Sequence, residues 1–408
     1  MPSKELKPTK PKILILCDYY LPGYKSGGGM RTIVNMVERF YKNYDFWIIT
    51  RDHDGKLDQN SYQAIKINDW NNVQNAKVYY LSKDKVKMSK LRELIIKCKP
   101  DVLYFNSYFS TLTIFTLLLH KLKLIYNCSK IVAPCGELSD GGLSLKQSKK
   151  KLFLKFAKLS GIYQKVIWKA SSNLEKDEIE RVSSSNAVCF IAPDIVPKQI
   201  LAEFNSSLKP RKISGKARLV FLSRFTRKKN FKFLLENLTE VKGDLLVDVW
   251  GPLEDLAYWE ECIEIIKTLP SNVTVELKGS IPFESVAAKL LEYHFFVLPT
   301  LGENFGHVFV EALSAGCPLL ISDQTPWTNL AEKKIGWDIP LTDIQKWRTI
   351  INQIIDLNDD SYTQLSGNAR IFAEGIISSQ VFVEDTKKVI EFALSNTLNK
   401  LLQANENG

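Results

Sequence analysis

Residues 295–322, FFVLPTLGENFGHVFVEALSAGCPLLIS, read as a strand, a loop, a helix, a turn of small residues and a second strand. Continuous apolar strands that alternate with helices are typical of parallel sheets covered on both faces. Similar apolar runs recur along the chain, and helical spacing lies between them at 31–41, 231–238 and 305–314. We therefore predict the α/β class. The runs are KILILC (12–17), FWIIT (46–50), DVLYFN (101–106), KIVAP (130–134), AVCFIAP (187–193), ARLVFL (217–222), DLLVDVW (244–250), NVTVEL (272–277), FFVLP (295–299) and PLLIS (318–322).

The runs divide into five on each side of residue 213, which predicts two doubly wound sheets, each in its own domain. The chain has 408 residues, enough for two or three domains with a core each. The polar segment NSSLKPRKISGK (205–216) is the best candidate for the linker. We expect an N-terminal domain over 1–205 and a second domain from 206 to 380.

Two carboxylates mark the stretch at 295–322 as a candidate site. Glu303 lies in the loop before the helix, and Glu311 lies inside the helix in the apolar setting ENFGHVFVEAL. Carboxylates accept hydrogen bonds from sugar hydroxyls, and the helix N-terminus near Phe305 offers donors to an anion. The structural alternative is a surface helix with two incidental glutamates, but the apolar neighbours of Glu311 favour a function.

Two further loops follow strands at the edge where α/β sheets bind ligands. In DYYLPGYKSGGGMR (18–31), the glycines at 27–29 let backbone N–H groups approach an anion, although a plain turn is an equal alternative. In LSRFTRKKN (222–230), Arg224 and Lys229 are suited to phosphate oxygens. A solvated basic turn is the alternative there.

These three pieces together resemble the family 4 (group 1) retaining glycosyltransferases. Residues 295–322 match the family signature, in which two glutamates are separated by seven residues. Residues 222–230 are similar to its phosphate-binding segment GRLxxxKG, with Ser223 and Asn230 in place of the glycines. The glycine loop with Arg31 matches the N-terminal motif. The resemblance runs from about Ile13 to about residue 395.

The resemblance implies the GT-B fold, with two Rossmann-like domains facing each other across a cleft. The N-terminal domain would bind the acceptor, the second would bind the nucleotide-sugar donor, and the last segment, 381–408, would cross back as a helix. It also implies the residue roles. Glu303, Arg224 and Lys229 would be catalytic, with Glu303 at the donor sugar and the two cations at the diphosphate. The donor-binding residues would be Glu311 at the ribose, Gly28 and Gly29 at the phosphates, and Asn304, Phe305, Gly306 and His307.

The donor implied is a nucleotide sugar, a UDP- or GDP-sugar above all, with no cofactor and no metal. The segments at 131–153 and 168–179 resemble those of bacterial surface-polysaccharide enzymes of O-antigen or capsule biosynthesis, whose acceptors are lipid-linked. Cys135, Lys169 and Asn106 depart from the usual Arg, His and His. Asn106 and Glu137 are the acceptor-side candidates, although Glu137 is as well explained by capping a turn.

Three other functions stay open within this fold. A glycosyltransferase-like subunit without activity is compatible with those departures. A sugar-nucleotide epimerase would need acid and base groups at the sugar, for which only Glu303 and His307 are evident. A phosphorylase would need a phosphate site beside a cofactor lysine, and no such motif is visible.

The net charge of +10 is uneven: residues 1–212 hold 36 basic and 19 acidic residues, and the remainder hold 19 and 26. The acidic second half argues against nucleic acid as a partner. Between residues 141 and 174 there are eight lysines and no acidic residue. We expect Leu152, Phe156, Leu159, Tyr163 and Val166 to form one helical face, which faces either an anionic membrane or the domain core.

The cysteine pattern and the lack of apolar segments predict a cytoplasmic protein, at most peripheral at the inner face of the cytoplasmic membrane. The seven cysteines are scattered and show no Cys-x-x-Cys pair, which is typical of reduced thiols. The basic start leads into an apolar run too short for a signal peptide, and no apolar stretch approaches the ~20 residues of a membrane span.

Overall fold

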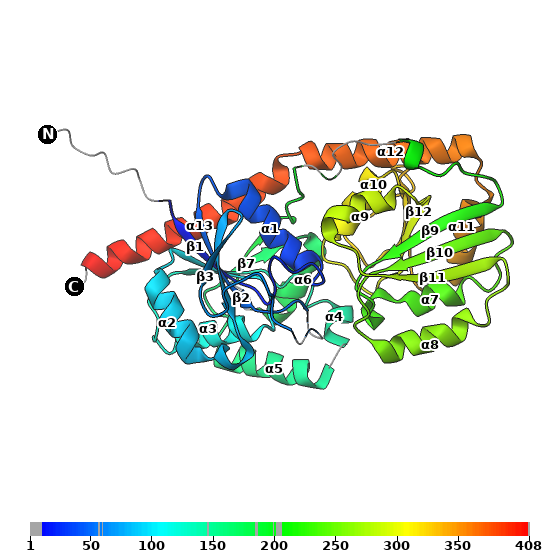
Figure 1. The fold of residues 1–408 in the computed structure, drawn as a ribbon. Coiled ribbons are helices and arrows are strands. Elements are labelled where there is room, and N and C mark those ends of the chain that lie inside the picture. Colours follow the sequence, from blue (N-terminus) through cyan, green and yellow to red (C-terminus); the bar gives the residue numbers. More distant parts are fainter. Residues whose placement is uncertain are drawn as a thin grey trace.

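The structure is a computed structural model, and it describes residues 10–55, 58, 60–144, 147–183, 187–198, 200 and 206–406. Two lobes, each built on its own sheet, lie side by side (Figure 1). Helices cover both sheets, and the strands at their centres are buried on both faces. The expected α/β architecture with two doubly wound sheets is therefore confirmed.

The N-terminal sheet has eight strands in the order β3-β4-β2-β1-β5-β6-β7-β8. All pairs are parallel except β3 with β4. Central strands such as β1 carry an unbroken apolar run, because both of their faces pack against helices. The strands are β1 (Lys12–Leu16), β2 (Asp45–Arg51), β3 (Trp70–Val73), β4 (Ala76–Leu81), β5 (Val102–Phe105), β6 (Ser129–Val132), β7 (Ile167–Ala170) and β8 (Val188–Ile191).

The helices of this lobe follow the strands in the alternating pattern of a doubly wound sheet. Helix α1 comes directly after the glycine loop, and α4 and α5 follow β6 toward the second lobe. The helices are α1 (Gly28–Phe40), α2 (Met88–Cys98), α3 (Thr111–Lys121), α4 (Asp140–Ser144), α5 (Gln147–Ser160) and α6 (Asn173–Val182), with a 3-10 turn at Lys83–Lys85.

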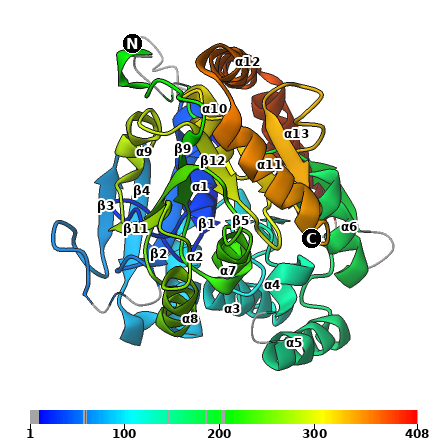
Figure 2. The ribbon, with the colours of Figure 1, turned by 90° about the vertical axis from the view of Figure 1, so that its right-hand side faces the viewer.

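The second sheet has six parallel strands in the order β11-β10-β9-β12-β13-β14. They are β9 (Lys216–Leu222), β10 (Asp244–Trp250), β11 (Val273–Gly279), β12 (Phe295–Leu298), β13 (Leu319–Ser322) and β14 (Gly336–Ile339). Figure 2 shows helices on both sides of this sheet, with α7 and α8 packed together and α10 between α9 and α12. These helices are α7 (Phe231–Glu236), α8 (Leu256–Ile266), α9 (Phe283–Leu290), α10 (His307–Ser314), α11 (Ile344–Asp356) and α12 (Asp359–Ser378), with 3-10 turns at Ser206–Leu208 and Arg227–Lys229.

The last helix, α13 (Val381–Glu406), connects the two lobes. At its start, Phe382 packs against the core of the second lobe. Further along, Val389 and Ile390 are buried in the core of the first lobe. Thr397 Oγ1 donates to the carbonyl of Asp101 at 3.1 Å and accepts from a backbone N–H of β6 at 3.0 Å. The helix therefore lies against the N-terminal sheet.

All ten predicted strands are present, and four strands had no prediction. Strands β3 and β14 lie at sheet edges, and β4 pairs with β3. Strand β7 is only four residues long, and Lys169 interrupts its apolar run. Edge strands such as β3 and β14 need less continuous hydrophobicity, and an exposed Lys77 in β4, like Lys169 in β7, interrupts the apolar run, so pattern alone does not reveal these four strands.

The lysine-rich stretch differs from the expectation of one continuous apolar face. Helix α5 ends at Ser160, so Tyr163 and Val166 lie beyond it. Val166 is buried, whereas Leu152 and Leu159 are exposed. The face is therefore not buried in the core. Lys146, one of the eight lysines between residues 141 and 174, lies outside the described residues, as does Asn205, where the N-terminal domain was expected to end.

None of the helices in the described ranges is both long and apolar enough to span a bilayer.

Candidate functional site

A cavity of about 160 Å³ lies between the two lobes, at the carboxyl ends of β1, β9 and β12. The N-terminal lobe contributes the glycine loop, and the second lobe contributes the loops after its strands and the start of α10. Seven of the twelve residues singled out from the sequence line it: Gly28, Arg224, Lys229, Glu303, Gly306, His307 and Glu311. Segments almost 300 residues apart thus meet at one place.

The two cations of the basic turn occupy different positions in the cavity. Arg224 follows β9, and its Nη1 contacts the Glu254 carboxylate at 3.2 and 3.3 Å. Lys229 lies at the end of a 3-10 turn and forms an ion pair with Glu303. Asn230, directly after the turn, has φ 57°, in the left-handed region that Asn tolerates better than most residues. It stands where the family pattern has glycine, so the backbone shape is kept.

Glu303 is an ionised carboxylate held by cations. Burial alone raises its pKa, but Lys229, Lys228 and Arg224 outweigh burial and hold the pKa below its ordinary value. Burial lowers the pKa of Lys228 to about 8. Lys228 does not line the cavity, whereas Arg224 and Lys229 do, and these two cations suit a phosphate group.

Glu311 is buried in α10 and forms an ion pair with Arg31 of α1, from the opposite lobe. The Arg31 guanidinium also lies 5.3 Å from the centre of the Phe283 ring. The other carboxylate oxygen of Glu311 is buried without a hydrogen-bond partner. Because buried carboxylate oxygens are normally paired, this oxygen has spare capacity to accept a hydrogen bond from a ligand.

The glycine loop approaches the second lobe closely. A Cβ on Gly27 would lie 3.2 Å from Arg224 Nε, and one on Gly28 would lie 3.6 Å from His307 Cδ2. Asp54, after β2, orders the residues before the loop. Its carboxylate accepts from the backbone N–H groups of Tyr24 at 2.6 Å and Lys25 at 2.9 Å. The loop is thus fixed in place by a buried carboxylate.

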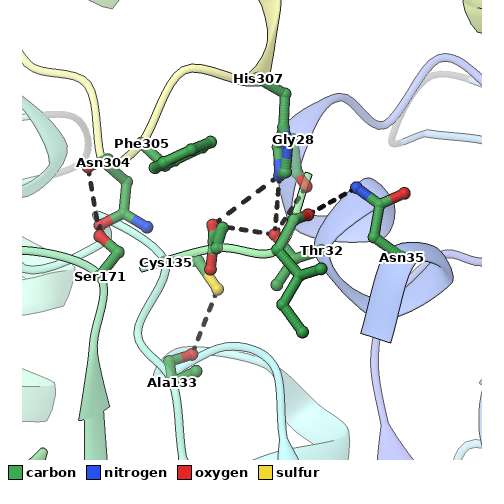
Figure 3. A network of polar contacts seen from close by, with 12 residues as sticks. Gly28, Thr32, Asn35, Ala133, Cys135, Ser171, Asn304, Phe305 and His307 are labelled. Carbon is green, nitrogen blue, oxygen red and sulfur yellow. Dashed lines mark hydrogen bonds and ion pairs between the residues drawn. The ribbon is translucent and has the colours of Figure 1, made fainter. Parts of the chain in front are cut away.

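His307, the first residue of α10, belongs to a network that joins the lobes (Figure 3). Its Nε2 lies 3.2 Å from Thr32 Oγ1. Thr32 Oγ1 also donates to Asp194 at 2.9 Å, and Asp194 accepts from Lys169 at 2.9 Å. Burial lowers the pKa of His307 to about 4, so the imidazole is neutral near pH 7. Lys169 is thus an internal counterion rather than a group facing the cavity.

A second contact between the lobes surrounds Asn304, which does not line the main cavity. Its amide lies 2.7 Å from Ser171 Oγ (Figure 3). It also faces the carboxylate of Glu175. Lys228 approaches the carbonyl of Gly136 at 3.3 Å from the same side. Asn304 therefore connects the signature loop with the end of β7.

Phe305, Gly29 and Asn106 also lie outside the lining of the cavity. Phe305 is buried against Trp327 and Phe382, and its carbonyl accepts from Trp327 Nε1 at 2.6 Å. The carbonyl of Gly29 accepts from Asn106 Nδ2 at 2.8 Å. These three residues shape the neighbourhood of the cavity through packing and backbone contacts.

Glu137 has the contacts expected of a turn cap. One of its carboxylate oxygens accepts from the backbone N–H groups of Tyr108 at 2.6 Å and Phe109 at 3.0 Å, and Ser107 Oγ donates to both oxygens. Burial raises its pKa above the ordinary value. Cys135, two residues before it in the chain, donates to Asn106 Oδ1 at 3.2 Å. The acceptor-side candidates therefore hold the loops after β5 and β6 together.

Sequence reasoning missed several residues that organise the site. Asp194, Glu254 and Asp54 each follow a strand, and that position was the only signal that could have identified them. Asp18, after β1, is also on this edge, where it accepts from Arg51 Nε at 3.0 Å and Ser110 Oγ at 2.8 Å. Their partners come from distant segments and are not visible in any local pattern.

Among the residues that the structure describes, no group of three or more His, Cys, Asp or Glu side chains is arranged to hold a metal ion.

The comparisons with known proteins agree with this geometry. Residues 204–372 match the family model described as "Glycosyl transferases group 1". No curated protein sequence matches the chain significantly.

Solved structures resemble the whole chain at low sequence identity. HepE from Anabaena, in complex with UDP and glucose, is 14% identical with a TM-score of 0.67, and the match covers 94% of this chain and 100% of that one. Sucrose-phosphate synthase from Thermosynechococcus elongatus is 15% identical with a TM-score of 0.69, over 95% and 100%. WaaG, a glycosyltransferase involved in lipopolysaccharide biosynthesis, is 11% identical with a TM-score of 0.62, over 92% and 98%. The chain thus has the GT-B fold, and its residues 204–372 match the group 1 glycosyl transferases.

Proposed function

We propose that this protein is a retaining glycosyltransferase of family 4 that transfers a sugar from a nucleotide-sugar donor to a lipid-linked acceptor glycan. The observation that supports this most is the convergence of Arg224, Lys229, Glu303 and Glu311 in one cavity between two lobes. Cations for a diphosphate and carboxylates for sugar hydroxyls are the groups that such a donor requires. The matched family model covers the same residues.

The contacts support the roles that we propose. The diphosphate takes the place of carboxylates as partner of Arg224 and Lys229, and the N-terminus of α10 adds a partial positive charge. Glu311 accepts from the ribose hydroxyls once Arg31 has moved from it, and Glu303 accepts from the donor sugar. The backbone of Gly28 faces the phosphates from the opposite lobe. No metal ion is needed in this scheme, because side-chain cations neutralise the leaving group.

The reaction that we propose keeps the anomeric configuration. The acceptor hydroxyl attacks the anomeric carbon from the side on which the diphosphate leaves. The bond between that carbon and the phosphate oxygen breaks as the bond to the acceptor oxygen forms, and the hydroxyl proton passes to the leaving phosphate. Stabilisation of the diphosphate by the cations provides most of the rate enhancement.

In this proposal, residues 1–205 bind the acceptor, residues 206–380 bind the donor, and residues 381–408 cross back to the first domain. The expected setting is the inner face of the bacterial cytoplasmic membrane, in O-antigen or capsule biosynthesis. The basic first half supports an anionic, lipid-linked acceptor, since opposite charge attracts both the acceptor and its membrane. A UDP- or GDP-sugar is the expected donor.

The test is a binding screen of the full chain against UDP-, GDP-, ADP- and dTDP-sugars, followed by mass spectrometry of products formed with a lipid diphosphate saccharide. We expect binding of one donor class and a product heavier by one sugar. Glu311→Ala should abolish donor binding. Glu264→Ala is the matched control, because Glu264 is exposed in α8 and outside the cavity.

Other outcomes would decide between the alternatives. Donor binding without transfer to any acceptor would favour an inactive subunit. Conversion of the free nucleotide sugar into its epimer would favour an epimerase. Failure to bind any nucleotide sugar would contradict the proposal.

A further inference from the structure

Helix α5 is apolar on two separate sides. Its inner side packs on the N-terminal lobe, where the Phe153 ring lies 5.9 Å from the ring of Tyr108 and 5.6 Å from that of Phe109. Ala157, one turn further, is 4% exposed. Because these side chains already attach the helix to the core, the fold needs no second apolar side.

The outer side nevertheless carries three large apolar residues. Leu152 is 71% exposed, Phe156 is 46% exposed and Leu159 is 90% exposed. They are spaced at i, i+4 and i+7, so they form one stripe along the helix. Single exposed apolar residues are ordinary on a protein surface, but an aligned set is typical of a contact site. In both views α5 lies at the outer edge of the molecule (Figures 1 and 2).

Four lysines surround this stripe: Lys149, Lys151, Lys155 and Lys158. All four are exposed, and within the described ranges no acidic side chain pairs with them. The sequence has no acidic residue between 141 and 174, and the nearest one before it, Asp140, pairs with Arg181 at 3.0 Å. The positive charge around the stripe is therefore not neutralised by the protein itself.

We propose that these seven residues, the α5 surface, bind an anionic phospholipid bilayer, with the helix in the plane of the interface. The three apolar side chains enter the boundary between headgroups and acyl chains, and the lysines contact lipid phosphates. Charge complementarity favours a bilayer, because lysines flank the stripe and only anionic lipid offers both negative charge and an apolar layer in that arrangement. The inference does not depend on the proposed enzymatic activity.

The position of α5 relates the α5 surface to the cavity. The preceding helix α4 contacts the second lobe, since a Cβ on Gly141 would lie 2.6 Å from the carbonyl oxygen of Leu301. Leu301 is two residues before Glu303, which lines the cavity. The helix that precedes the α5 surface therefore adjoins the second lobe beside the cavity.

The experiment is co-sedimentation of the full chain with vesicles of phosphatidylglycerol and phosphatidylcholine, compared with phosphatidylcholine alone. We expect binding to the anionic vesicles only, weakened by salt because screening reduces the attraction. Replacing the four lysines by Gln should lower the partition coefficient by about fivefold for each lysine. Leu152→Ser, Phe156→Ser and Leu159→Ser together should lower it by about tenfold or more.

Matched variants on the second lobe and α13 serve as controls. The first control changes the net charge by the same amount as the four lysine substitutions in α5, through Lys242→Gln, Lys334→Gln, Lys346→Gln and Lys387→Gln. The second control removes three apolar side chains of similar exposure, through Ile344→Ser, Ile371→Ser and Val381→Ser. Both controls should bind as the unaltered chain does. Thermal unfolding of every variant should shift little, because all these side chains are exposed or half-exposed, and it checks that the fold is kept.

Three results would overturn the inference. One is equal binding of the α5 variants and the controls, and another is binding to neutral vesicles that salt does not weaken. The third is self-association, measured by light scattering without vesicles, that the apolar α5 variant abolishes while vesicle binding is absent. That result would assign the α5 surface to a second copy of the chain.

Discussion

At the scale of single residues, the cavity is organised by ion pairs between groups that are largely removed from water. Lys229 pairs with Glu303, and Arg31 pairs with Glu311 from the opposite lobe. The pair with Lys229 helps to hold the pKa of Glu303 below its ordinary value although burial raises it. The partners therefore matter for stability as well as for any ligand.

Lys229→Ala separates these two contributions. We expect turnover to fall by about a hundredfold or more, because one cation at the leaving group is lost. We also expect the free energy of unfolding to fall by about 1–3 kcal/mol, since Glu303 is left largely buried without its nearest cation. Steady-state rates and chemical denaturation measure the two effects.

The control combines Lys229→Ala with Glu303→Gln. Removing the unpaired charge should restore stability but leave turnover low. Near-normal turnover in the single variant would exclude Lys229 from the mechanism.

Glu178 of α6 predicts a pH dependence of stability. Burial raises its pKa to about 7, and the negative charge of Glu175 adds to the rise. A carboxyl with a raised pKa stabilises the fold fully below its unfolded pKa, about 4.5, and this contribution is lost as the pH rises through about 7. Between about pH 5 and 8, the folded chain should therefore lose up to about 2–3 kcal/mol relative to Glu178→Gln.

Denaturation of both proteins across this range measures the difference. His307 and His294 both have pKa values lowered to about 4 by burial, and they act in the opposite direction below about pH 6.5. Because they are present in both proteins, their effect cancels. A difference that is constant with pH would show that Glu178 stays charged throughout.

At the scale of elements, the start of α10 depends on one glycine. Gly306 has φ 78°, and a Cβ there would lie 2.5 Å from the ring of Phe309. Gly28, at the start of α1, has open space by comparison, with its nearest neighbour at 3.6 Å. Gly306→Ala should therefore lower stability by about 1–2 kcal/mol, whereas Gly28→Ala should leave it almost unchanged.

Thermal unfolding of the two Ala variants provides this comparison. The pair is matched, because Gly306 directly precedes α10, Gly28 is the first residue of α1, and both glycines line the cavity. Equal stability of the two variants would show that the left-handed turn before α10 can relax.

The elements themselves were visible in the sequence where they are long, central and apolar. Strands such as β12 and β13 are buried on both faces, so their residues must be apolar without interruption. Strand β14, Gly336–Ile339, contains an aspartate and lies at an edge, where the sheet makes no such demand. The single helical face predicted over residues 152–166 was too long, because α5 ends at Ser160 and only Leu152, Phe156 and Leu159 of that set lie on it.

At the scale of the whole molecule, the lobes are joined by contacts across the cavity. They include the Arg31–Glu311 ion pair, the contact of Thr32 with His307, and that of Ser171 with Asn304. The cavity of about 160 Å³ is smaller than the about 300–1,000 Å³ of typical ligand sites. A nucleotide sugar would therefore need the lobes to separate before it enters.

Linking the lobes tests this requirement. We would introduce cysteines at Ser171 and Asn304 and join them with a short bifunctional thiol reagent. The link should hold the lobes together and lower the affinity for a nucleotide sugar by about tenfold or more. Each single cysteine variant, treated with the same reagent, controls for reaction at native thiols such as Cys135 and Cys189. Unchanged affinity in the linked protein would show that donors enter without separation of the lobes.

The sequence by itself determined the α/β class, the two sheets and the segments that line the cavity, because buried strands and glycine turns impose local residue choices. Only the tertiary structure decided which charges meet: Arg31 with Glu311, Glu254 with Arg224, and Lys169 with Asp194. It also decided that one side of α5 is exposed. The physical reason is that an ion pair or an exposed face depends on the packing of segments far apart in the chain, whereas a local pattern reports only the environment of its own segment.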